Sequence, residues 1–397
     1  MQGGIMNRRV GYDFVIQTLA TALVIFTVAS VVGCRPKVTR ETSSTSRTGL
    51  LVVNPQFQYA GEFSEGLGRV QIGDDKTGKW GFIDKQGNMA ISPQFDFAGD
   101  FADGLAAVQI GNDKTGKWGF IDKQGRFAVN PQFGWSNGFS EGLAAVWVGD
   151  TNTGKCGYID KQGHFAVNPQ FGWCAPFSEG LGAVQAGDQK TGKWGYIDKQ
   201  GHFAVNSQFG WSGPFHDGIA AARIGDNETG KYGYIDKQGH FVVNPQFDEE
   251  EQFSNGLAAV RIGDIKTGKY GYIDKQGHFV VNLQFGEAGE FTEGLAEVRI
   301  GDVKTGKWGF IDTQGKFAVN PQFGPPIWAG LQTDEFHGGL AVVNVGSGDN
   351  SKYGYIDKQG HFVVNPQFDE AGNFSEGMAA VRIGNDKTGK YGYIARY

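Results

Sequence analysis

Two kinds of side chain that can bind metals or transfer protons recur at fixed intervals in this sequence. An aspartate follows isoleucine in near-identical copies of Ile-Asp-Lys-Gln-Gly, and a histidine often stands directly after the glycine. The aspartates are Asp84, Asp122, Asp160, Asp198, Asp236, Asp274, Asp312 and Asp357, and the histidines are His164, His202, His240, His278 and His361. Aspartate at the first position of a tight turn accepts backbone N–H bonds, which explains the first series structurally. Neighbouring units seldom bring such histidines onto one ion, so we expect strand-edge imidazoles and no metal site.

No arrangement typical of an enzyme breaks this regularity. Catalysis needs a few residues that differ from the pattern in one place, whereas the slots here are filled again and again. The sequence contains no Gly-x-Ser-x-Gly, His-Glu-x-x-His, phosphate-binding loop or dinucleotide-binding glycine pattern. We therefore expect neither catalytic residues nor a cofactor, and an enzyme is the unsupported alternative.

Two cysteines replace the usual residue of their slots within one unit. Cys156 stands where most copies have tryptophan or tyrosine, and Cys174 follows 18 residues later. In an exported protein this spacing suggests a disulfide. Two buried packing thiols are the alternative, and the sequence leaves both open.

Tryptophans occur in the segments that vary between copies. After Pro-Gln-Phe or its variant, the chain reads Gly-Trp-Ser or Gly-Trp-Cys at 134–136, 172–174 and 210–212, and acidic at 248–252. Varied loops on a fixed scaffold commonly carry recognition, and tryptophan offers a large contact area at little entropic cost. The candidate contacts for a protein or glycan are Trp135, Trp173, Trp211 and Trp328. Alternatively, these rings fill gaps between neighbouring units.

A 38-residue period organises the chain from residue 50 to its end. One copy reads KYGYIDKQGHFVVNPQF at 231–247, and a single longer step of 45 residues separates Trp308 from Tyr353. Each unit predicts three strands joined by two hairpins, and the link that carries Phe291 could supply a fourth. Small or apolar residues on both strand faces indicate sheets sandwiched between neighbours. The glycine after each aromatic residue would leave room for an adjacent unit's ring.

The two ends of the repeat array complement each other. It begins with a lone third strand at 50–57 and finishes with two strands at 377–397 that lack their third. Exchange of these segments would close the ring, as in propellers. We therefore predict an all-β, propeller-like closed array of nine units over 50–397, with an open β-solenoid as the alternative.

The repeated motif resembles the WG repeat, also called the KWG repeat, of bacterial proteins. The resemblance rests on Lys-[Trp/Tyr]-Gly-[Phe/Tyr]-Ile-Asp-Lys-Gln-Gly followed by Pro-Gln-Phe and Phe-x-Glu-Gly-Leu, and covers about 51–397. Departures are Cys156, Ser207, Leu283 and Thr313. The resemblance implies an all-β head, often exported, that binds other molecules and shares no catalytic residues.

The N-terminal segment has the composition of an export signal. A basic start around Arg8 precedes an almost wholly apolar stretch that ends in Val-Val-Gly-Cys at Cys34, whether translation starts at Met1 or Met6. This ending resembles a bacterial lipobox, which implies a signal over 1–33, a lipid on Cys34 and a tether over 34–49. Arg35 then favours the outer membrane. A transmembrane anchor and a plain secretory signal are the alternatives.

Composition narrows the partners that such a head could have. The net charge of −6 gives no reason to expect nucleic acid. The leading hypothesis is an envelope-anchored scaffold for protein–protein contacts, held at the membrane by its N-terminal lipid and facing the periplasm or the exterior. A module that binds envelope glycan or peptidoglycan is the second hypothesis.

Overall fold

The computed structural model describes residues 49–396 apart from 75, 113–114, 150–152, 326–334, 347 and 386. Within these residues the chain is built from strands, with one short 3-10 helix, η1, at Gly348–Asn350. The same residues hold no apolar helix of membrane-spanning length. Cys34, the signal segment 1–33 and the tether up to residue 48 lie outside the described residues, as does Trp328.

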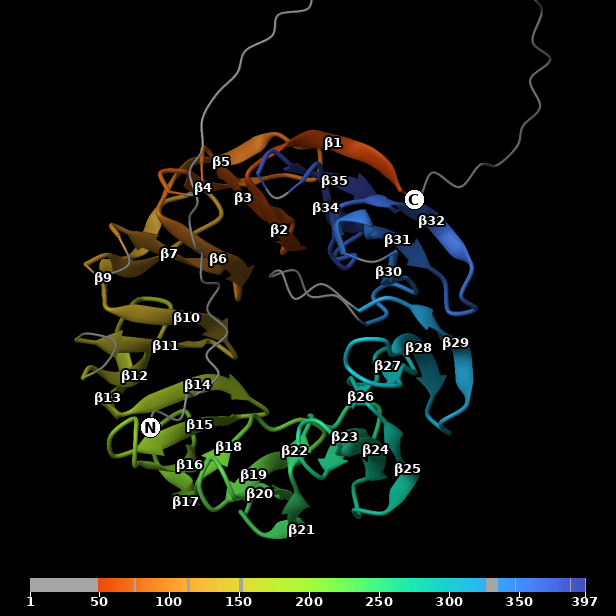
Figure 1. Cartoon of the computed structure of the whole chain (residues 1–397). Helices are drawn as coiled ribbons and strands as arrows, with labels where there is room; N and C mark the ends of the chain where they lie inside the picture. Colours follow the sequence, from red (N-terminus) through yellow and green to blue (C-terminus); the bar gives the residue numbers. More distant parts are fainter. Residues whose placement is uncertain are drawn as a thin grey trace, which may run out of the picture. The chain divides into compact units, whose positions relative to one another are not determined.

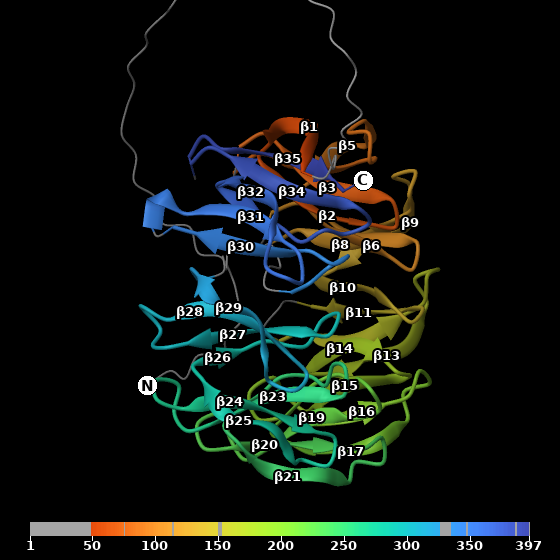
Figure 2. The ribbon, with the colours of Figure 1, turned by 90° about the vertical axis from the view of Figure 1, so that its right-hand side faces the viewer.

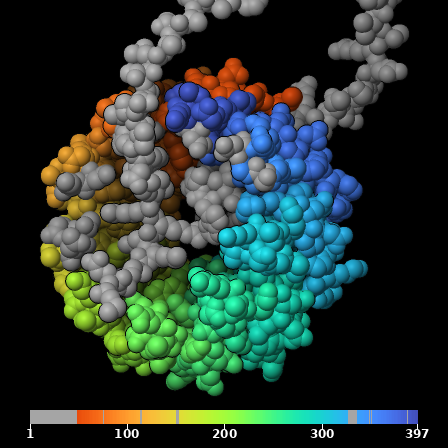
Figure 3. Space-filling view, viewed as in Figure 1, coloured from red at the N-terminus to blue at the C-terminus, as the bar shows by residue number. Residues whose placement is uncertain are grey.

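The strands form nine antiparallel sheets that stand as blades around a ring (Figure 1). Eight of these sheets have four strands and one has three among the described residues. The blades follow one another in chain order around the ring (Figures 2 and 3). We number them 1 to 9, from β2–β5 to the last blade, which combines β33, β34, β35 and β1.

Each blade runs from the centre of the ring to its rim (Figure 1). The inner strands are β2 (Tyr59–Ser64), β6 (Phe97–Ala102), β10 (Trp135–Ser140), β14 (Trp173–Ser178), β18 (Trp211–Ser212), β22 (Glu249–Glu250), β26 (Glu287–Ala288) and β33 (Glu370–Ala371). The second strands are β3 (Leu67–Ile72), β7 (Leu105–Ile110), β11 (Leu143–Val148), β15 (Leu181–Ala186), β19 (Ala220–Ile224), β23 (Leu257–Ile262), β27 (Leu295–Ile300), β30 (Ala341–Val345) and β34 (Met378–Ile383). The third strands are β4 (Lys79–Ile83), β8 (Lys117–Ile121), β12 (Lys155–Ile159), β16 (Lys193–Ile197), β20 (Lys231–Ile235), β24 (Lys269–Asp274), β28 (Lys307–Asp312), β31 (Lys352–Ile356) and β35 (Lys390–Ala395). The outer strands are β5 (Met89–Phe95), β9 (Phe127–Phe133), β13 (Phe165–Phe171), β17 (Phe203–Phe209), β21 (Phe241–Phe247), β25 (Phe279–Phe285), β29 (Phe317–Phe323), β32 (Phe362–Phe368) and β1 (Leu50–Phe57).

The inner strands confirm that the link after Pro-Gln-Phe or its variant adds a fourth strand in eight of the nine blades among the described residues. Antiparallel pairing places the first-to-second and third-to-fourth turns on one side of the ring, which we call the turn face. The loops from second to third strand and the links between blades lie on the other side, the loop face.

The ring is closed by strand exchange between the two ends of the repeat array. Strand β1 pairs with β35, with Leu50 opposite Ala395 and Phe57 opposite Tyr391. The N–H of Gly49 donates to the Ala395 carbonyl at 2.9 Å, so the third-to-fourth turn is reproduced by two separate segments. The closed array is confirmed, and the open solenoid is excluded.

The first-to-second turns also fasten neighbouring blades together. In blade 1 the turn residues Glu65 and Gly66 have φ angles of 52° and 89°, as a two-residue type I′ turn requires. Glutamate rarely adopts a positive φ angle, and the contacts of the Glu65 side chain explain why this residue stands here. The Glu65 carboxylate accepts the N–H of Gly104 at 3.1 Å and pairs with Lys123 Nζ at 3.2 Å, both in blade 2.

Among the described residues this ion pair recurs at six of the nine junctions between blades. A lysine of the Asp-Lys-Gln-Gly turn reaches the acidic residue of the preceding blade at Lys85–Glu376, Lys123–Glu65, Lys199–Glu141, Lys237–Glu179, Lys275–Asp217 and Lys358–Glu293. Between blades 6 and 7 the corresponding residues are Asn255 and Thr313, so both partners are replaced together. Asn255 Nδ2 instead donates to the Phe291 carbonyl at 2.9 Å. The departure at Thr313 thus coincides with the loss of the acidic partner at position 255.

Buried tyrosines add a second connection between blades. Tyr272 is fully buried in blade 6 and donates its O–H to the Gly289 carbonyl of blade 7 at 2.9 Å. Six blades repeat this bond, through Tyr158, Tyr196, Tyr234, Tyr272, Tyr355 and Tyr393. Burial raises the pKa of these phenols, because the charged form would be desolvated.

One packing expectation was wrong. The glycine after each aromatic residue makes room for backbone of its own blade, not for a neighbouring ring. A Cβ on Gly119 would lie 2.5 Å from the Val129 carbonyl oxygen and 2.7 Å from the Pro131 nitrogen, both in the outer strand. The outer strand comes just as close to Gly195 and Gly271, where Ser207 and Leu283 replace the proline, so glycine is needed at this position in those blades too.

Candidate binding face

Tryptophans Trp135 and Trp173 begin adjacent inner strands on the loop face. Trp135 lies 6.3 Å from the Trp118 ring of the preceding blade and 6.1 Å from Trp173 of the following blade, between ring centroids. Trp147 of the second strand lies between them, 4.7 Å from Trp135 and 5.1 Å from Trp173. The structure therefore brings two of the four predicted tryptophans into one cluster.

The cluster is one end of a longer chain of rings. Centroid distances of 5.1 to 5.6 Å join Tyr391, Tyr59, Trp80, Phe97 and Trp118 in succession. We call the eight rings from blade 9 to blade 4 the aromatic arc, namely Tyr391, Tyr59, Trp80, Phe97, Trp118, Trp135, Trp147 and Trp173. Aromatic rings therefore run continuously across five neighbouring blades on the loop face.

The arc is partly buried and partly open to solvent. Trp118 and Trp147 are buried, whereas Tyr59, Trp135 and Trp173 are half-buried. Phe97, in the middle of the arc, has 38% of its surface exposed. The arc thus fills gaps between blades and also presents an apolar edge to solvent.

The other predicted tryptophans lie elsewhere. Trp211 is half-buried, and its ring lies 5.7 Å from that of Tyr232, between centroids; among the described residues it makes no ring contact with the arc. Trp328 lies outside the described residues. Sequence reasoning missed Phe97 and Tyr59, although both occupy the same position after Pro-Gln-Phe as Trp135.

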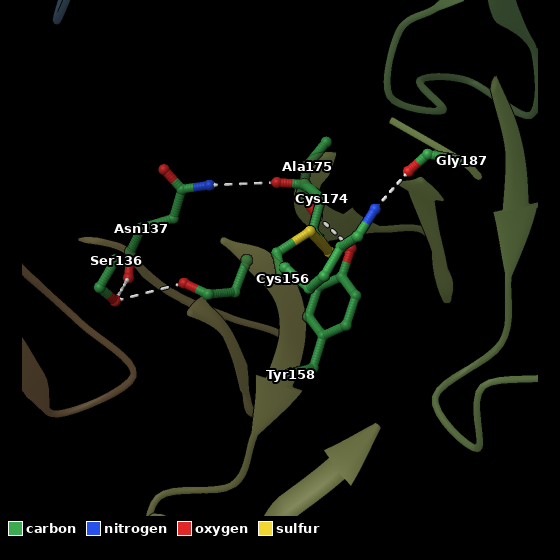
Figure 4. Close-up of a disulfide and its surroundings, with 9 residues drawn as sticks. Ser136, Asn137, Cys156, Tyr158, Cys174, Ala175 and Gly187 are labelled. Carbon is green, nitrogen blue, oxygen red and sulfur yellow. Dashed lines mark hydrogen bonds between the residues drawn. A yellow bond between two sulfur atoms is a disulfide. The ribbon is translucent and has the colours of Figure 1, made fainter. Parts of the chain in front are cut away.

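Cys156 and Cys174 form a disulfide that joins blade 3 to blade 4 beneath the arc (Figure 4). Their Cα atoms are 6.0 Å apart, a usual separation for this bond. Strand pairing explains the missing ring at Cys156, because Trp147 lies directly opposite it. Other blades pair glutamine, asparagine or arginine with tryptophan or tyrosine at these two positions, so blade 3 has moved its ring to the facing strand.

Hydrogen bonds strengthen the same junction (Figure 4). The Tyr158 O–H donates to the Ala175 carbonyl at 2.7 Å, and Asn137 Nδ2 donates to the Cys174 carbonyl at 3.5 Å. Lys155 Nζ donates to the Gly187 carbonyl at 2.7 Å. The base of the arc is therefore fixed covalently and by polar contacts.

The opposite part of the loop face is ionic. Glu249 occupies the position of Trp135 in its blade and pairs with Arg261 at 2.8 Å. The Arg261 guanidinium also lies over the Tyr270 ring, 5.9 Å from its centroid. The same pairing recurs as Glu287–Arg299 in blade 7 and as Glu370–Arg382 in blade 9, where it adjoins Tyr391 at the end of the arc. One face therefore has an aromatic sector and a charged sector.

The repeated aspartates and histidines behave as turn residues. Asp198 Oδ1 accepts the N–H groups of Gln200 and His202, each at 2.9 Å. Hydrogen bonding, chiefly from the His202 N–H, lowers the pKa of Asp198. His202 itself is 80% exposed and lies 3.3 Å from the same aspartate. Among the described residues, no three His, Cys, Asp or Glu side chains are grouped to hold a metal ion.

Comparison with known proteins gives a family match and a shared fold. The sequence model described as "WG containing repeat" matches residues 47–76, 80–114, 118–150, 157–189, 194–227, 232–264, 270–303, 308–324 and 353–391. No curated protein matches the chain. The crystal structure of a eukaryotic initiation factor matches with a TM-score of 0.56 and 12% identity, over 83% of this chain and 91% of that one. The Dos1 propeller matches at a TM-score of 0.42 and 12% identity, over 87% and 96% of the two chains.

Proposed function

Because the chain belongs to the family built from the WG-containing repeat, we propose that it is an envelope-anchored scaffold whose aromatic arc binds a partner protein. Repeat β-propellers generally suit protein-interaction scaffolds, since they offer broad, rigid faces. The proposal adds the place of contact and the anchoring through Cys34. It assigns no catalytic role.

The partly exposed arc is the observation that carries this proposal. Interfaces concentrate their binding free energy in aromatic side chains that are held rigidly and become desolvated. The half-buried rings of Trp135 and Trp173 are fixed by packing and by the disulfide beneath them, so little entropy is lost on binding. Phe97 adds an exposed apolar group at the centre.

The position of the chain entry fits an anchored head. Leu50 pairs with the last residue of β35, at the turn face, whereas Phe57 lies at the loop face. A tether that joins the ring at Gly49 would therefore enter on the face opposite the arc. An anchor at Cys34 would leave the arc free for a partner.

A glycan is the alternative ligand of the same surface. Sugars usually stack on the flat faces of aromatic rings. Here Trp118 and Trp135 are tilted by 57°, and Trp135 and Trp147 meet at 78°, so these rings do not form one flat stacking surface. This packing favours a protein partner that contacts ring edges.

Site-specific photocrosslinking tests the proposal in cells. A photoreactive amino acid at position 97 should yield a discrete protein adduct that mass spectrometry identifies. Position 127 is the matched control, because Phe127 has a similar exposure of 42% and lies at the rim of the ring, on the outer strand of the same blade. The adduct should form only from position 97. Equal adducts from both positions, or none from position 97, would contradict the proposed surface.

A charge-introducing variant gives the second measurement. Phe97→Glu should weaken the affinity for the identified partner at least about tenfold, while Phe127→Glu should leave that affinity unchanged. A polysaccharide pull-down with the same pair separates the two ligands. Loss of polysaccharide binding in Phe97→Glu, without loss of a protein partner, would establish the glycan alternative.

A further inference from the structure

A second group of pattern-breaking residues lies on the inner strands and the segments that continue them, which face the centre of the ring (Figure 1). The residue before the recurring inner phenylalanine is Gly138, Pro176 or Pro214 in blades 3 to 5. The corresponding residues are acidic in blades 7, 8, 1 and 2, with Asn373 in blade 9 between them, and we call three of these acids, Glu290, Glu62 and Asp100, the wall carboxylates. One contiguous part of the inner wall is therefore mainly acidic, and the other is neutral.

The positive groups near this wall do not match all of its acids. Arg69 Nε pairs with Asp100 at 2.9 Å, and His337 Nε2 lies 3.2 Å from Glu335 of blade 8. Burial raises the pKa of Glu62 and of Glu290, because desolvation disfavours their ionised forms. His337 and Arg69 oppose this effect at Glu62, but among the described residues they form their ion pairs with Glu335 and Asp100 instead.

Two enclosed polar groups lack hydrogen-bond partners at the same wall. Asn373, in blade 9, is 3% exposed, and neither its Oδ1 nor its Nδ2 is hydrogen-bonded. It holds the position that Glu62 holds in blade 1. The Glu62 Oε1 atom is likewise enclosed and unpartnered. Enclosed polar atoms are normally satisfied, so such a pair points to a missing ligand.

The two groups lie close together across the blade 9–blade 1 junction. Tyr355 donates its O–H to the Gly372 carbonyl at 2.7 Å, directly before Asn373. Ser375, two residues after Asn373, donates its Oγ–H to the carbonyl of Phe63, the residue directly after Glu62, at 2.6 Å. Glu62 Oε1 and Asn373 Oδ1 can therefore accept N–H bonds from one ligand.

We propose that this wall binds a cationic peptide segment of a partner protein, with lysine or arginine N–H groups donating to Glu62 and Asn373. Acidic groups placed one to a blade suit charges spaced along a peptide. They do not suit a single metal ion, for which the described residues provide no three-ligand group. The inference rests on the proposed function, since it takes the ligand to be part of a protein.

Binding of labelled hexa-arginine to the purified full chain tests the inference by fluorescence anisotropy. Glu62→Gln with Glu290→Gln should weaken binding at least about tenfold, because charged hydrogen bonds are lost without loss of volume. Asp188→Asn with Asp302→Asn removes the same charge from second-to-third loops, where Asn112 and Asn385 occur naturally. This control should change affinity less than about twofold. Absent binding, or an equal loss in both double variants, would overturn the proposal.

Two further measurements separate this site from the arc and from simple folding effects. Asn373→Leu should raise the midpoint of thermal unfolding, because it removes an unpartnered polar group. The same variant should weaken the binding of hexa-arginine. A lower midpoint with unchanged peptide affinity would contradict the assigned role. Phe97→Glu should leave hexa-arginine binding intact even if it abolishes partner binding, and a shared loss would refute a separate site. Spermidine binding without peptide binding would also overturn the peptide assignment.

Discussion

Phe57 offers a direct test of how firmly strand exchange closes the ring. It is the last residue of β1, lies opposite Tyr391 and is 2% exposed. Its ring belongs to a core cluster with Val53, Phe63 and Tyr393, which come from both ends of the repeat array. The perturbation is Phe57→Ala.

The expected magnitude follows from this burial. Truncating a fully buried phenylalanine costs about 3–5 kcal/mol when the surrounding structure stays in place. Phe209 is the matched internal position, since it ends β17, lies opposite Trp194 and is 1% exposed. In a closed ring the two positions should be structurally equivalent. We therefore expect the two variants to lose the same free energy of unfolding to within about 1 kcal/mol.

Urea unfolding followed by circular dichroism measures both losses, and hydrogen exchange of the β1 amides reports directly on that strand. The β1 amides should be as protected as those of β17 in the unmodified protein. A loss below about 1 kcal/mol for Phe57→Ala, beside a full loss for Phe209→Ala, would show that β1 detaches before the ring unfolds. That result would refute the reasoning that closure makes the end strands equivalent to internal ones.

Three further predictions concern the contacts between blades. Asn255→Glu combined with Thr313→Lys should create the missing ion pair between blades 6 and 7. A double-mutant cycle should give a favourable coupling of about 0.5 kcal/mol, because the pair is partly solvated. Zero coupling would contradict the role of this ion pair in joining blades. Serine at both Cys156 and Cys174 should lower the free energy of unfolding by about 3 kcal/mol, and unchanged urea midpoints would show that the bridge adds no stability. Side-chain hydrogen bonding from its loop lowers the pKa of Asp264 to about 2, so the stabilisation from such loop aspartates, present above their unfolded pKa, should disappear as pH falls from about 4 towards 2. The wall carboxylates have raised pKa values, so their ionised forms destabilise the fold, and this destabilisation should diminish as pH falls below neutral. A thermal midpoint that drops steadily from neutral pH would contradict this prediction.

Much of the architecture was predictable because each blade repeats one local solution. Alternating turns and strands of a 38-residue unit identify the meander, and the aspartate of each turn satisfies backbone groups within five residues of itself. The complementary ends at 50–57 and 377–397 predicted closure. These features depend on contacts that are local or that repeat at the period.

The contacts between blades were harder to predict. Glu65 and Lys123 are 58 residues apart and meet only because one turn of each blade lies on the same face of the ring. The positive φ of Glu65 gives no sequence signal until its partner is known. The glycine after each aromatic residue was correctly predicted to mark a close approach. At Gly119, however, the approaching atoms belong to the outer strand of the same blade and not to a neighbouring unit.

The sequence by itself determined the repeating unit, its strands and turns, and the closure of the array, because these follow from periodicity and complementary ends. Only the tertiary structure decided which varied residues meet. It joined Phe97, Trp135 and Trp173 into one aromatic surface and placed Trp211 beside Tyr232. It also brought the segments of Glu62 and Asn373, which are far apart in the chain, to one junction of the inner wall, where Ser375 donates to the Phe63 carbonyl. The physical reason is that a ring converts sequence separation into angular position, so recognition depends on which blades become neighbours and which face each residue occupies.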